Sequence, residues 1–183
     1  DKLVVHLDLK AGNILLDMLD DGRAGRTWKL CDFGEAVRLH KGEDQVINTH
    51  DAHGRRHLTA EIASPELFSG TGVGMKADIF AFGCVMWSIL TRLHAWHWIQ
   101  GAYKGNAIEK AVGLDAKRPL CPKSQLTDMI RLCMHHNPEM RPTAQDLSIW
   151  AHKRFPNPRR QSRSTRSHVV SNESVVRVLE VPS

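Results

Sequence analysis

The short stretch HLDLKAGN, residues 6–13, gathers the chemical groups that a phosphoryl-transfer enzyme needs. It brings the carboxyl group of Asp8, the amine of Lys10 and the amide of Asn13 close together in the chain, and the tripeptide DFG adds a second carboxyl group at Asp32. Such enzymes work chiefly by positioning the reactants and neutralising charge. Each stretch is short enough to occur by chance, so the surrounding sequence must show whether the two belong to a phosphoryl-transfer site.

Short strands are predicted on both sides of this stretch. Residues 3–5, 13–17 and 27–33 are apolar runs, and the Asp- and Gly-rich residues 17–26 between the last two read as a turn. These last two runs are therefore predicted to form a β-hairpin. Residues 34–57 show no periodicity and predict a long loop, which in a compact domain is usually functional or disordered.

The middle of the chain is predicted to be helical. Residues 76–91 are apolar on nearly every side, which indicates a central buried helix. Residues 106–113 place Ile108 and Val112 on one face of a second helix.

Two further helices are predicted towards the end. Residues 124–136 have apolar side chains at helical spacing, with Ser124 as the expected N-cap. Thr143 and Asp146 resemble a capping box with Asp in place of the usual Glu, and they open a last helix through Trp150.

Composition indicates a globular protein with a basic tail. The 183 residues are 42% hydrophobic and 25% charged, and the net charge of +5 is concentrated in residues 154–168. Residues 156–183, rich in Ser, Arg and Pro, are expected to be a disordered tail. A mild basic excess in a tail argues only weakly for nucleic-acid binding, so no nucleic-acid partner is expected. The longest apolar run, residues 79–90, is too short to span a bilayer.

The four cysteines lie far apart and form no CxxC pair. This pattern favours reduced, buried thiols and a cytoplasmic location over a disulfide framework.

The order and spacing of several short motifs give the chain a resemblance to a known protein family. HLDLKAGNILL is followed by LCDFG, a long loop, LTAEIASPE at 58–66, DIFAFG at 78–83 and NPEMRP at 137–142. This series resembles the large lobe of the protein kinases over roughly residues 1–152. The implied fold is mainly α, a helical bundle with a short β-hairpin at the catalytic cleft, and the small β-rich lobe is absent. The expected domains are a partial kinase domain over residues 1–155 and the tail.

The resemblance implies a role for each residue that matches a family motif. Asp8 matches the catalytic aspartate that orients the substrate hydroxyl and accepts its proton, and Lys10 matches the lysine that balances charge on the transferring phosphate. Asn13 and Asp32 match the two Mg²⁺ ligands, and Leu15 matches the apolar residue beneath the adenine ring of ATP. The expected partners are thus ATP, Mg²⁺ and a protein substrate, with no membrane segment.

Other matches are structural in the family. His6 and Phe33 correspond to stacked residues, and Asp78 corresponds to an aspartate that hydrogen-bonds the catalytic-loop backbone. Glu66 and Arg141 would form a buried ion pair.

Two positions bear on the substrate class. Lys10 and a threonine at position 59 fit the serine/threonine kinases, in which that threonine contacts the catalytic aspartate. The stretch AFGCVMWSILT looks more like the tyrosine-kinase-like group. A serine/threonine kinase of that group reconciles both.

Several positions depart from the family pattern. Leu7 stands where many kinases have an arginine that pairs with a phosphate on the activation loop, Ala11 replaces a frequent proline, and Ser64 replaces an alanine. No glycine-rich loop or strand lysine precedes Asp1, so the chain is expected to be a fragment of a longer protein and inactive by itself.

Three alternatives stay open at this point, of which one is a truncated or mispredicted gene product with no activity at all. A pseudokinase, or signalling scaffold without phosphotransfer, would use the same fold, although retention of the four polar residues at the site argues against it. A zinc site is the other reading of the histidines, at positions 50, 53 and 57 and in the HxxH of His94 and His97.

Overall fold

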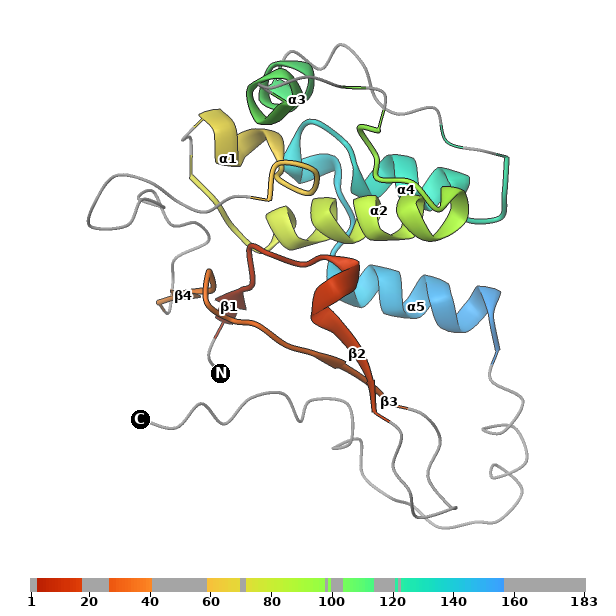
Figure 1. The fold of residues 1–183 in the computed structure, drawn as a ribbon. Coiled ribbons are helices and arrows are strands. Elements are labelled where there is room, and N and C mark those ends of the chain that lie inside the picture. Colours follow the sequence, from red (N-terminus) through yellow and green to blue (C-terminus); the bar gives the residue numbers. More distant parts are fainter. Residues whose placement is uncertain are drawn as a thin grey trace, which may run out of the picture. The chain divides into compact units, whose positions relative to one another are not determined.

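The computed structural model describes residues 3–17, 27–40, 59–69, 72–97, 99, 104–113, 121 and 123–156. The chain divides into two units, residues 1–146 and residues 147–183. Figure 1 shows the helices and strands along the chain. The predicted disordered tail lies outside the described residues from residue 157 onward.

The strands form two small antiparallel sheets. β1 (Leu3–Val5) pairs with β4 (Val37–Leu39), and β2 (Ile14–Asp17) pairs with β3 (Thr27–Leu30), which confirms the predicted hairpin. β3 ends earlier than predicted because Asp32 has a left-handed φ of 61°, which an extended strand cannot accommodate.

β4 was not predicted, and the expectation of a continuous loop over residues 34–57 was wrong there. The strand has only three residues, and its central Arg38 is exposed. A segment this short shows too little alternation of apolar and polar residues to be predicted as a strand. Its main stabilisation comes from pairing with β1, which is distant in the sequence.

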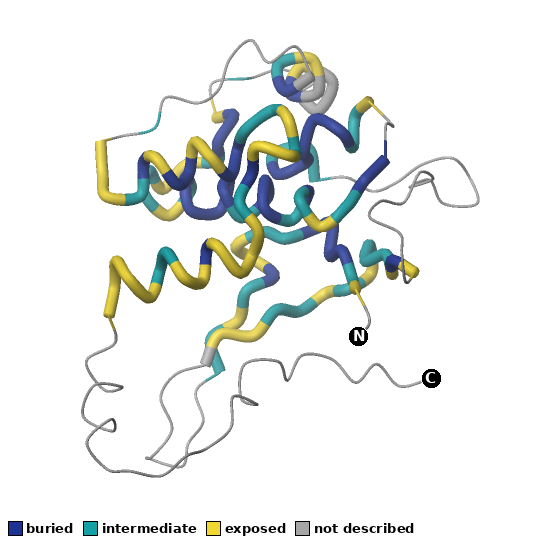
Figure 2. Tube along the Cα trace, turned by 180° about the vertical axis from the view of Figure 1, so that it is seen from behind, coloured by how far each residue is buried: buried dark blue, intermediate teal, exposed yellow. Residues whose placement is uncertain are grey.

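Helix α2 (Lys76–Thr91) is the central buried helix, with the predicted bounds. Figure 2 shows buried residues concentrated along this helix and the segments packed on it, whereas β2 and β3 are mostly intermediate or exposed. α4 (Thr127–Cys133) packs against α2, and the short α1 (Pro65–Ser69) packs against α3 (Lys104–Gly113). Ile108 and Val112 of α3 are both buried, as predicted.

Gly83 allows the close approach of α2 and the end of α4. A Cβ atom at this position would lie 2.7 Å from Cγ of Met134 and 2.9 Å from Cβ of Cys133. Both distances are shorter than carbon atoms tolerate without displacement, so the packing depends on the missing side chain.

The predicted N-cap of α4 was wrong. The helix begins at Thr127, and its cap residue Leu126 makes no side-chain capping bond. Ser124 instead forms a local turn, in which its hydroxyl accepts from the Leu126 N–H at 3.1 Å and its own N–H donates to Thr127 Oγ1 at 2.8 Å. Serine hydroxyls bond readily to nearby backbone in such turns, which competes with capping.

The last helix begins as predicted. α5 (Ala144–Arg154) is opened by a capping box in which the Asp146 N–H donates to Thr143 Oγ1 at 3.1 Å and the Thr143 N–H donates to Asp146 Oδ2 at 2.9 Å. Single-turn helices also occur at η1 (Ala11–Asn13) and η2 (Pro138–Met140). No helix within the described ranges combines the length and apolar character needed to cross a membrane.

Candidate active site

Asp78, in the first turn of α2, fixes the backbone of the loop that carries Asp8. Its Oδ2 accepts from the His6 N–H at 2.7 Å, and its Oδ1 accepts from the Leu7 N–H at 2.9 Å. Burial raises the pKa of Asp78, although the two backbone donors act in the opposite direction. The predicted contact between this aspartate and the loop backbone is confirmed.

The ring of His6 connects this loop to the DFG stretch. Nδ1 accepts from the Asp8 N–H at 3.3 Å, so Nε2 must carry the proton, and it donates to the carbonyl of Cys31 at 3.1 Å. The ring also contacts Phe33, with centroids 4.7 Å apart and planes tilted by 55°. The predicted His6–Phe33 contact is confirmed, in a tilted geometry.

Leu7 has a buried, apolar environment. Its side chain packs in a core cluster with Val5, Leu39, Val73 and Ala77. Its φ of 64° lies in the left-handed region, which costs a non-glycine residue about 1–3 kcal/mol. The two hydrogen bonds to Asp78 and the burial of the side chain hold this conformation.

Three side chains converge on the carboxylate of Asp8. Lys10 Nζ donates to Oδ2 at 2.7 Å, Thr59 Oγ1 donates to Oδ1 at 2.7 Å, and Asn13 Nδ2 donates to Oδ2 at 3.0 Å. Burial alone would raise the pKa of Asp8, but these hydrogen bonds and the charge of Lys10 outweigh it and lower the pKa. Asp8 is therefore ionised at neutral pH and accepts hydrogen bonds on both oxygens.

Lys10 contacts the carboxylate of Asp8 and is also influenced by the charge of Asp32. Its hydrogen bond to Asp8 raises the pKa of Lys10, and the negative charges of Asp8 and Asp32 add to this effect. Asp32 is exposed, and its Oδ1 accepts from the Gly34 N–H at 3.3 Å. The raised pKa keeps the ammonium group charged at neutral pH, and its side chain is 38% exposed.

Asn13 and Asp32 offer hard oxygen atoms that suit Mg²⁺. Asn13 Nδ2 donates to the carbonyl and to Oδ2 of Asp8, so the amide is held in one orientation. Its Oδ1 accepts no hydrogen bond from any described residue. An amide oxygen and an exposed carboxylate fit a cation that keeps most of its water ligands. Leu15, on the adjoining strand β2, is 52% exposed.

The Glu66–Arg141 pair lies in the interior and is confirmed as a buried ion pair. Arg141 Nη1 and Nη2 contact the two oxygens of Glu66 at 2.6 and 2.8 Å, and Arg141 is only 2% exposed. The remaining N–H groups donate to carbonyl oxygens of Lys76, His135 and His136. All five donors of the guanidinium group are therefore used, and the group also lies over the Phe80 ring at 5.0 Å.

Comparison with known proteins shows to which family a chain with this arrangement of residues belongs. The family described as Protein kinase domain matches residues 1–153. The chain belongs to the protein kinase family. It is 33% identical over 147 residues to the dual specificity protein kinase shkA of Dictyostelium discoideum. The matched region covers 78% of this chain and 25% of that protein.

Other relatives are similar to the same part of the chain. Mitogen-activated protein kinase kinase kinase 7 of Drosophila melanogaster is 31% identical over 147 residues, covering 79% of this chain and 19% of that protein. The human protein of the same name is 29% identical over 150 residues, covering 80% and 22%. This kinase chain thus spans a quarter or less of the length of these three relatives.

The structure brings several of the predicted site residues of this kinase domain together. Asp8, Lys10 and Asn13 are in direct contact, and the expected contact between Thr59 and Asp8 is present. Asp32 interacts with Lys10 through its charge.

Sequence reasoning missed two features of this kinase domain. The first is the apolar environment of Leu7, which depends on the unpredicted pairing of β4 with β1. The second is Ser64, which is 0% exposed and whose hydroxyl has no hydrogen-bond partner among the described residues.

The histidines that raised the zinc alternative lie partly outside the described residues, at positions 50, 53 and 57. The rings of His94 and His97 are 6.3 Å apart, edge to face. The described ranges hold no group of three or more His, Cys, Asp or Glu residues that could bind a metal ion.

Proposed function

We propose that this chain forms the large-lobe part of a serine/threonine protein kinase that transfers the γ-phosphoryl group of ATP to a protein hydroxyl. The convergence of Lys10, Asn13 and Thr59 on Asp8 carries the proposal. A carboxylate so held has a fixed direction and a lowered pKa, which suits it to orient a hydroxyl group.

The proposed mechanism uses each group for one task. Asp8 accepts a hydrogen bond from the substrate hydroxyl and takes its proton as the oxygen bonds to phosphorus and the bond to the leaving ADP oxygen breaks. Lys10 neutralises negative charge on the transferring phosphoryl group. Asn13 Oδ1 and Asp32 would hold Mg²⁺, which offsets phosphate charge when bound. Leu15 would contact the adenine ring.

Serine/threonine specificity rests on Lys10 and Thr59, which occupy the two oxygens of Asp8. The relatives support it in part, because one is named a probable serine/threonine-protein kinase and another a dual specificity protein kinase. Membership of the tyrosine-kinase-like group, a cytoplasmic location and completion of the ATP site by an upstream small lobe belong to the same proposal.

We further propose that activity does not require a phosphate paired at position 7. Leu7 occupies a buried apolar cluster, where neither a cation nor a phosphate would be solvated. Full-length protein treated with a phosphatase should keep its rate of substrate phosphorylation once the phosphatase is removed. Loss of activity on treatment, with recovery on rephosphorylation, would contradict this.

The decisive experiment measures phosphate transfer by the full-length protein with Mg²⁺-ATP and a serine/threonine substrate. Asp8→Asn should abolish incorporation, because an amide neither accepts the proton nor carries the charge. Asp17→Asn is the matched control, since the half-buried Asp17 pairs with the exposed Lys29 on the β-hairpin and makes no contact with Asp8 among the described residues. Equal incorporation by wild type and Asp8→Asn would remove Asp8 from the mechanism and favour the scaffold alternative.

A further inference from the structure

The end of helix α5 presents apolar and basic side chains to solvent together. Ile149 is 48% exposed and Phe155, directly after the helix, is 51% exposed. The last turn between them consists of His152, Lys153 and Arg154, which are exposed as well. Exposed residues predominate along α5 in Figure 2. This helix end therefore offers a partner both apolar surface and positive charge.

The aromatic ring at this helix end is held in position. The Phe155 N–H donates to the Ala151 carbonyl at 2.8 Å, so the helical turn continues through this residue. The ring also meets the ring of Trp150 edge to face, with centroids 5.9 Å apart. Apolar surface that is fixed in this way can enter a partner with little further loss of conformational freedom.

The sequence that begins in α5 carries the whole positive excess of the chain. Residues 147–172 contain six Lys and Arg residues and no Asp or Glu, which gives them a formal charge of +6. The six are Lys153, Arg154, Arg159, Arg160, Arg163 and Arg166. The whole chain has a formal charge of +5, so the remaining residues together carry −1. An anionic surface would therefore attract this part of the chain in preference to the rest.

The end of a helix explains only part of this pattern. Cations in the last turn are favoured by the partial negative charge of the terminal carbonyl groups, which accounts for Lys153 and Arg154. That effect falls off within one turn, so it does not account for the four arginines at positions 159–166. It does not account for the exposed Ile149 and Phe155 either. A partner that combines negative charge with an apolar interior accounts for all of these features.

We infer that residues 149–166 bind the surface of a bilayer that contains anionic phospholipid. The basic side chains would pair with the lipid headgroups, and Phe155 and Ile149 would enter the boundary between headgroups and acyl chains. One such signal alone binds a membrane weakly, whereas two together bind it stably. Nucleic acid would also attract the arginines, but the aliphatic side chain of Ile149 has no aromatic face on which a base could stack.

Flotation of the full-length protein with lipid vesicles tests this inference. Vesicles of phosphatidylcholine alone are compared with vesicles in which about one third of the lipid is phosphatidylserine. The partition coefficient should be at least about tenfold higher for the anionic vesicles, because several basic residues contribute to it. It should fall steeply between roughly 0.1 M and roughly 0.5 M salt, because salt screens the attraction.

Substitutions at the helix end separate the two contributions. Lys153→Gln combined with Arg154→Gln should weaken binding to anionic vesicles about twenty-five-fold, since each basic residue near such a surface contributes about fivefold. Phe155→Ala should weaken it about tenfold, through the loss of apolar surface. Phe155→Leu should stay within about threefold of the wild type, because the bilayer requires apolar surface and not an aromatic ring.

Two sets of control substitutions lie in the other unit of the chain, residues 1–146. Lys123→Gln combined with Arg131→Gln removes the same charge at two exposed positions. Met140→Ala removes a side chain of a residue that is 57% exposed. Each control should bind within about twofold of the wild type, because the attraction falls off within a Debye length of the surface. All variants should keep the melting temperature, since every substituted residue is exposed.

Several results would overturn the inference. These are no binding to either kind of vesicle, equal binding to both kinds, or a loss in the controls as large as that in the helix-end variants. The same proteins are also titrated with duplex DNA and single-stranded RNA, and fluorescence anisotropy measures binding. Nucleic-acid binding that is tighter than vesicle binding and is lost in Phe155→Leu would assign these residues to nucleic acid instead.

Discussion

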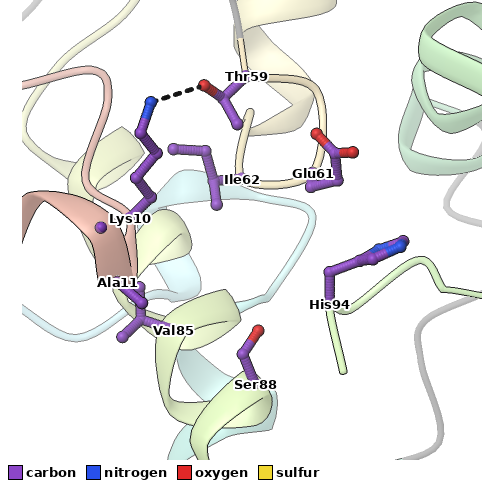
Figure 3. A pocket seen from close by; sticks show the side chains of 9 residues that line it. Lys10, Ala11, Thr59, Glu61, Ile62, Val85, Ser88 and His94 are labelled. Carbon is purple, nitrogen blue, oxygen red and sulfur yellow. Dashed lines mark hydrogen bonds between the residues drawn. The ribbon is translucent and has the colours of Figure 1, made fainter. Parts of the chain in front are cut away.

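Two clusters in this kinase domain pair a carboxylate with a basic side chain, and they differ in how completely their hydrogen-bonding groups are used. Around Arg141, every N–H group of the guanidinium has a protein partner and the residue is almost fully buried. Around Asp8, the Lys10 amine has hydrogen-bond partners for only two of its three N–H groups among the described residues, Asp8 Oδ2 at 2.7 Å and Thr59 Oγ1 at 3.5 Å (Figure 3), and its side chain is 38% exposed. The saturated cluster suits a structural role, and the unsaturated cluster suits chemistry.

The largest expected effect comes from breaking the saturated cluster. Arg141→Ala should lower the free energy of unfolding by about 3–5 kcal/mol, because Glu66 would remain buried without its partner. Chemical denaturation of the protein measures this loss. Arg141→Lys should recover only part of it, since an ammonium group has fewer donors and cannot match the two oxygens of Glu66 in a planar fork.

Removing the lysine of the other cluster should give the opposite pattern. Lys10→Ala is expected to lower kcat of the full-length protein roughly a hundredfold to a thousandfold, the usual range for loss of one group that stabilises a developing charge. Its unfolding free energy should change by less than about 1 kcal/mol, since the pair is partly exposed. Steady-state kinetics and denaturation on the same samples test both halves.

Lys29→Ala is the control for this comparison, because the side chain of Lys29 is 63% exposed and pairs with Asp17 on the hairpin. It should alter neither quantity appreciably. A stability loss in Lys10→Ala as large as that in Arg141→Ala would erase the distinction between the two clusters.

The packing next to the Glu66–Arg141 cluster can be weakened without changing a charged residue. Gly83→Ala places a methyl group against Met134 and Cys133, just before the His135 and His136 carbonyls that accept from Arg141. The expected destabilisation is about 1–3 kcal/mol, as for other overpacked interiors. Thermal unfolding measures it, and an unchanged melting temperature would show that α4 can move away at no cost.

The sequence predicted the elements whose signals are local. The apolar run of α2 and the capping box of Thr143 and Asp146 specify their own helices, and the motif order placed Asp8, Lys10 and Asn13 in one site. β4 and the environment of Leu7 could not be predicted in this way. Both depend on segments far apart in the chain, since β4 pairs with β1 and its Leu39 packs with Val73 in the cluster around Leu7.

The smallest expected change in stability comes from Ser64, a buried polar residue two positions before Glu66. The hydroxyl of Ser64 is buried and has no hydrogen-bond partner among the described residues, so it loses contact with water and gains nothing in return there. Ser64→Ala should therefore raise the free energy of unfolding by about 1 kcal/mol, with a matching rise in melting temperature. Ser69→Ala, at an exposed serine of α1, the helix that follows Ser64, should change stability by less than about 0.5 kcal/mol. A destabilised Ser64→Ala variant would mean that the hydroxyl is satisfied after all, and that this buried region is saturated throughout.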